Sequence, residues 1–136
     1  MARLRAALGI VAGIMLILSG AAHSGLGWKS LGAQLAAAAV PADLQLNLKI
    51  GWHFGGAAML LLGTILVGLF ARRLSGAVVP SFPALAIAAV YLAFGTWAIL
   101  ASGNPFFFDF IVPALLLVYT TPGTPTDWQQ IGFEAL

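Results

Sequence analysis

The chain contains no cysteine and very little charge. Without cysteine it can form neither a disulfide framework nor a thiolate metal site, and it has no cysteine nucleophile. Charged residues make up only 7% of its 136 residues, against about 25% in a typical soluble domain. This number of charges is too small to cover a surface that faces water. We therefore expect the chain to face lipid. The net charge of +2 forms no basic stripe, which argues against nucleic acid as a partner.

Long uncharged runs predict an all-α integral membrane protein, folded over residues 1–136 as one compact bundle of four transmembrane helices. A membrane span needs roughly 20 consecutive apolar residues. The interval from Arg5 to Lys29 and the interval from Lys49 to Arg72 both provide that length. Glycine and proline clusters separate the two remaining apolar runs. The predicted spans are residues 6–23, 50–71, 84–101 and 106–119.

Two segments lie outside these spans. Leu31 and Leu35 fall on one helical face beside Trp28, which predicts a short interfacial helix between the first two spans. Residues 120–136 are rich in proline and glycine at their start, so they are predicted to form a cytoplasmic tail, in which Asp127 could cap one or two helical turns.

The first apolar run also has features of a secretory signal peptide. Arg3 and Arg5 precede it, and small residues follow it at positions 19–22. We interpret this run as a retained first helix. Its removal would leave three spans.

Basic residues in the predicted loops set the orientation. Four arginines fall on one side and two lysines on the other: Arg3, Arg5, Arg72 and Arg73 against Lys29 and Lys49. By the positive-inside rule both termini are cytoplasmic, and we expect a bacterial inner membrane. Glycines with GxxxG spacing, the pairs Gly9–Gly13 and Gly51–Gly55, indicate close helix packing.

Three ionisable side chains lie within the spans: His23, His53 and Asp109. Each lies near the outer end of its span, so the topology predicts that they share one polar pocket. Two imidazoles and a carboxylate are the ligand set of a facial metal triad. His23 and His53 alone could bind a haem or a chlorin, and an Asp–His pair could move protons. Alternatively, residues so close to the membrane end reach water by snorkelling and only support the fold.

A histidine that ends the first span, followed by the segment Gly51-Trp52-His53-Phe54-Gly55 at the start of the second, resembles small bacterial four-helix membrane proteins of unassigned function. The resemblance covers most of the chain in topology. It implies no activity and no site.

These observations leave three hypotheses for function. No catalytic motif or phosphate-binding loop is present, which favours a non-catalytic accessory subunit or an oligomeric membrane component, with the lipid bilayer, other membrane subunits or a second copy as partners. The second hypothesis is a protein that binds haem, a chlorin or a divalent metal through His23 and His53. The third is a small enzyme or transporter with a His53/Asp109 site.

Overall fold

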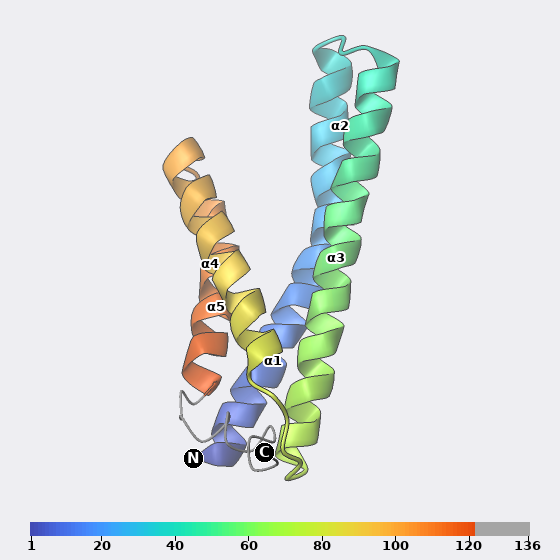
Figure 1. Ribbon diagram of the computed structural model, residues 1–136. Helices are drawn as coiled ribbons and strands as arrows, with labels where there is room; N and C mark the ends of the chain where they lie inside the picture. Colours follow the sequence, from blue (N-terminus) through green and yellow to red (C-terminus); the bar gives the residue numbers. More distant parts are fainter. Residues whose placement is uncertain (122–136) are drawn as a thin grey trace, which may run out of the picture. The chain divides into compact units, whose positions relative to one another are not determined.

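The computed structural model describes residues 1–121, and within that range every regular element is a helix (Figure 1). In chain order the elements are α1 (Ala2–Ala22), η1 (His23–Gly27), α2 (Trp28–Ala37), α3 (Ala42–Leu74), α4 (Phe82–Ser102), η2 (Pro105–Phe107) and α5 (Phe108–Thr120). The predicted all-α class is therefore confirmed. The predicted tail lies, from residue 122 onward, outside the described residues.

Three helical runs are long and apolar enough to cross a membrane, namely Ala2–Ala37, Ala42–Leu74 and Phe82–Ser102, and they suggest a membrane location. The fourth predicted span corresponds to a shorter apolar stretch, Pro105–Thr120. With a rise of about 1.5 Å per residue, this stretch is shorter than the hydrocarbon core of roughly 30 Å.

The first helical run continues beyond residue 23, where the first span is predicted to end. η1 is π-helical, and Ala22 before it and Trp28 after it both keep right-handed helical backbone angles. Residues 28–37 are helical as predicted and form α2, which continues from α1 through η1, so a distinct interfacial helix is not confirmed. The run ends at Ala37, and Ala39 takes a positive φ of 51° in the turn that follows.

Proline and glycine set the ends of the later helices. Pro41 precedes α3, and its carbonyl accepts from the backbone N–H of Gln45, so this helix begins at Ala42, eight residues before the predicted span. α4 ends at Gly103, whose φ of 65° lies in the left-handed region that glycine adopts without strain. Asn104 then accepts from the backbone N–H of Phe106 and caps η2.

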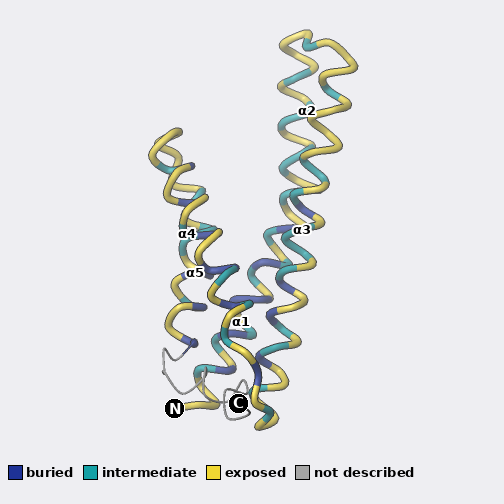
Figure 2. Tube along the Cα trace, viewed as in Figure 1, coloured by how far each residue is buried: buried dark blue, intermediate teal, exposed yellow. Residues whose placement is uncertain are grey.

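The chain folds into two compact units: unit 1 comprises Met1–Ala12 and Leu66–Leu136, and unit 2 comprises Gly13–Ile65. Unit 1 contains the α4–α5 pair, and both helices carry buried side chains. They include Ala84, Ile87, Ala88, Tyr91, Ala114 and Leu117. Unit 2 is an antiparallel hairpin in which residues 13–37 of the first helical run lie beside residues 42–65 of α3 (Figure 1). Figure 2 shows exposed residues along most of α2 and the adjoining part of α3. A single four-span domain stays a prediction.

Glycines bring the two arms of unit 2 into backbone contact. A Cβ atom on Gly63 would lie 2.6 Å from the carbonyl oxygen of Gly13, and one on Gly20 would lie 2.8 Å from that of Gly56. Both distances are too short for a side chain, so only glycine permits this approach. Gly51 instead has open space around it, so the Gly51–Gly55 pair predicted from GxxxG spacing does not form a packing pair.

Candidate functional site

The structure places two of the three predicted site residues in one unit. His23 begins η1 and His53 lies in α3, both in unit 2, whereas Asp109 lies in the first turn of α5 in unit 1. The two imidazoles interact electrostatically. Within neither unit do three His, Asp or Glu side chains of residues 1–121 group as a metal site. A site that joins Asp109 to the histidines stays a prediction.

His23 forms the best-defined contact of this region. Its imidazole stacks on the indole of Trp52, with ring centroids 4.2 Å apart and an angle of 7° between the planes. The same indole donates its N–H to the carbonyl oxygen of His23 at 2.6 Å. A tryptophan N–H in an apolar setting requires such an acceptor. The His23–Trp52 pair therefore connects η1 to α3 through both a ring face and a hydrogen bond.

Two glycines make room for this pair. A Cβ atom on Gly27 would lie 3.0 Å from the Trp52 ring, closer than nearly all side-chain contacts. A Cβ atom on Gly55 would lie 3.5 Å from Nε2 of His23, which is an ordinary contact distance. We therefore infer that position 27 requires glycine more strictly than position 55.

His53 belongs to a second aromatic contact, formed with Trp28 and Lys49. The imidazole of His53 lies 5.9 Å from the Trp28 ring at an angle of 49°. The ammonium nitrogen of Lys49 lies 6.0 Å from the centroid of the same ring, within cation–π range. Lys49 and His53 are four residues apart on α3, so they share one helical face. We call these three residues the Trp28 cluster.

The hydrogen bonding of the imidazoles bears on the cofactor prediction. A histidine that ligates a metal usually donates its other ring N–H to a carbonyl or carboxylate. The imidazole of His23 also has a hydrogen-bond interaction with the backbone of Trp52. A contact of this kind orients the ring in a packed hairpin and in a ligand site alike, so it does not distinguish between the two. Haem, chlorin and metal binding stay predictions.

In unit 1, Asp109 lies near an aromatic group. It interacts electrostatically with Tyr91 of α4, whose ring packs 5.4 Å from that of Phe110. The hydroxyl of Tyr91 is buried and has no hydrogen-bond partner among residues 1–121. Tyr91, Phe94 and Trp97 are spaced three residues apart on α4, and along this stripe the exposure rises from 5% at Tyr91 to 63% at Trp97.

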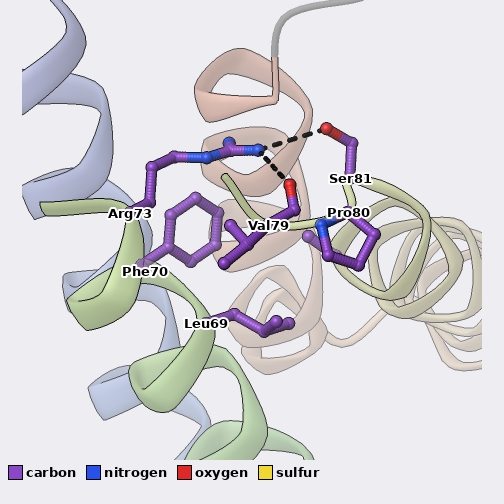
Figure 3. Close-up of a pocket in the computed structure, with 7 residues that line it drawn as sticks. Leu69, Phe70, Arg73, Val79, Pro80 and Ser81 are labelled. Carbon is purple, nitrogen blue, oxygen red and sulfur yellow. Dashed lines mark hydrogen bonds between the residues drawn. The ribbon is translucent and has the colours of Figure 1, made fainter. Parts of the chain in front are cut away.

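Arg73 carries a role that the sequence did not reveal (Figure 3). Its guanidinium donates to the carbonyl oxygen of Val79 at 3.2 Å, to Oγ of Ser81 at 3.2 Å and to the carbonyl oxygen of Thr120 at 3.4 Å. It also lies over the ring of Phe70. The hollow beside it admits no water-sized sphere, so this region is packing rather than a ligand site.

No protein-family model matches the chain, and neither the curated proteins nor the solved structures include a match. The case for function therefore depends on the residues and contacts of the chain itself.

Proposed function

We propose that the chain is a non-catalytic membrane component that assembles with other membrane subunits or with a second copy of itself. One observation carries the non-catalytic part. Histidine is a side-chain type that often takes part in catalysis. The imidazole of His23 instead stacks on the indole of Trp52, with ring centroids 4.2 Å apart, so it serves the packing of the hairpin. Its neighbour, His53, packs against Trp28.

The length of the last apolar stretch supports the assembly part. Pro105–Thr120 is shorter than the other apolar runs, and a short hydrophobic segment in a bilayer is accommodated by local thinning, by snorkelling or by association with other helices. Large side chains on α5 remain exposed for such association, among them Val112 and Leu115. In this proposal residues 106–119 cross the membrane as the fourth span.

The proposed orientation has both termini in the cytoplasm of a bacterium whose inner membrane holds the chain. Arg5 and Arg73 support one shared side for the arginines, because both contact the end of α5. The guanidinium of Arg5 lies 5.7 Å from the Tyr119 ring, and Arg73 bonds to Thr120. Residues 28–37 lie at the outer interface in this arrangement.

Cross-linking in intact membranes tests the assembly. A short amine- and photo-reactive cross-linker is applied to cells that make the full chain, and the products are identified by mass spectrometry. We expect links from Lys29 or Lys49 to a second copy or to a defined membrane protein. Recovery of the uncross-linked monomer alone, at reagent levels that link a known membrane dimer, would contradict the proposal.

A second candidate function is the binding of haem, a chlorin or a divalent metal through His23 and His53. The specific observation in its favour is the π-helical segment that begins at His23, since π-helical turns occur frequently at functional sites. A visible absorption spectrum and a metal analysis of the purified chain test it. A colourless, metal-free chain from cells supplied with haem, chlorin and divalent metals would contradict it.

A further inference from the structure

We propose that the Trp28 cluster binds the phosphate group of a membrane phospholipid. Lys49 and His53 project from one face of α3 onto the ring of Trp28, which lies where η1 joins α2. The cluster therefore gathers an ammonium group, an imidazole and an indole in one place within unit 2. This proposal goes beyond the assembly function and does not depend on it.

The cluster is rich in donors and holds no anionic group. Lysine offers three N–H donors and no acceptor, the indole offers one donor, and a protonated imidazole offers two. The remaining charged residues of Gly13–Ile65 are Lys29 and Asp43, and Asp43 lies in the first turn of α3, six residues before Lys49. A ligand with several negative oxygens complements such a group, and a phosphate is that kind of ligand.

Charge also disfavours a metal ion at His53. A dication there would approach the Lys49 ammonium, which lies against the same indole ring as His53. Like charges at that range repel, and the local groups include no carboxylate to offset the repulsion. An anion gains energy from the same arrangement.

The surroundings identify the anion as a lipid phosphate rather than a free one. Leu26, Ile50 and Phe54 flank the cluster in sequence, and all three are exposed, with Leu26 and Phe54 at 73% and 75%. These exposed apolar side chains, each within two residues of a cluster member in sequence, are available to acyl chains. Tryptophan and lysine also prefer the depth at which lipid phosphates lie.

The test measures lipid binding to the purified full chain by native mass spectrometry in a detergent without phosphate. Short-chain phosphatidylglycerol is the probe, and diacylglycerol with the same acyl chains is the uncharged comparison. We expect one phosphatidylglycerol per chain and at least about fivefold weaker binding for Lys49→Gln, the effect of removing one basic residue at a membrane surface. Equal binding of diacylglycerol would overturn the proposal, because the acyl chains alone would then account for it.

Matched variants separate the site from general charge. Lys29→Gln removes the same charge one residue from Trp28 but outside the cluster, and we expect it to bind as the wild type does. Lys49→Arg should retain binding, and His53→Phe should weaken it. A far-UV circular dichroism melt identifies any variant that fails to fold. Equal losses for Lys29→Gln and Lys49→Gln would overturn the proposal.

Inorganic phosphate distinguishes the source of the anion. If the ligand is a lipid, inorganic phosphate at the probe concentration leaves phosphatidylglycerol bound. Displacement at that concentration would assign the cluster to a soluble anion and overturn the lipid proposal. A chain that binds the lipid but yields no cross-linked partner would contradict the assembly function alone, so the two failures are distinguishable.

Discussion

Replacing Gly63 by alanine tests the backbone contact between the arms of unit 2. The added Cβ would lie 2.6 Å from the carbonyl oxygen of Gly13 and 2.9 Å from the backbone nitrogen of Ile17. Both neighbours are backbone atoms of a helix, so neither can rotate away and the arms must separate. Overpacking of this kind costs about 1–3 kcal/mol of unfolding free energy.

Gly68→Ala is the matched control in the same helix. Nothing lies within 4 Å of a Cβ at Gly68, so this variant reports only the helix propensity of alanine over glycine, about 0.5–1 kcal/mol in favour of alanine. The same propensity gain applies at Gly63. The difference between the two variants is therefore the overpacking cost alone, about 1–3 kcal/mol.

The assay is unfolding of the purified chain by increasing mole fractions of sodium dodecyl sulfate, followed by far-UV circular dichroism. We expect Gly68→Ala to unfold at a higher mole fraction than the wild type and Gly63→Ala to unfold at a lower one than Gly68→Ala. Equal midpoints for the two variants would refute the close approach of the arms.

The same assay checks three further variants. Trp52→Phe keeps an aromatic ring on His23 but removes the indole donor, so we expect a loss of about 1–3 kcal/mol, and no loss would mean that water replaces the bond. Arg73→Gln loses hydrogen bonds made by a charged group, including the one to Thr120, and should cost about 1.5–3 kcal/mol; a wild-type midpoint would show that these bonds are not formed in solution. Tyr91→Phe removes a buried hydroxyl without a partner among the described residues, so we expect equal or higher stability, and a clear loss would reveal a hidden partner.

The sequence predicts the helices well because charge is excluded from the apolar runs. Proline placement also gives the start of α3, since Pro41 cannot continue a preceding helix and fits the first turn of the next. The separate interfacial helix predicted after the first span is not confirmed. Gly27 admits the Trp52 ring, and the helical backbone continues through a π-helical turn between α1 and α2.

The packing partners could not be predicted from spacing alone. GxxxG spacing selects Gly51 and Gly55, whereas the arms meet at Gly56 and Gly63, which are seven residues apart. On an α-helix, residues separated by four positions and residues separated by seven positions both lie on nearly the same face. Sequence spacing alone therefore leaves several glycine pairs equivalent. The choice among them depends on the register between the two arms, and that register is a property of the tertiary fold.

For the candidate site, sequence reasoning found the residues but not their contacts. It placed His23 and His53 at similar depth, and the structure places both in unit 2. It could not foresee that each imidazole would pack on a tryptophan of the opposite arm, because those pairs again depend on register. It also missed the hydrogen bonds of Arg73, whose acceptors are mostly backbone carbonyls and carry no signal in the sequence.

Packing and ligand binding use different parts of an imidazole. Stacking on Trp52 occupies a face of the His23 ring, whereas a ligand or a hydrogen bond uses the nitrogens in the plane of that ring. The stack therefore fixes the orientation of the ring without consuming its donors and acceptors. His53 also packs on a tryptophan, Trp28, but here the ammonium group of Lys49 lies against the same ring. In the proposed lipid site, the charge of that lysine, rather than the histidine itself, favours an anion over a metal ion at His53.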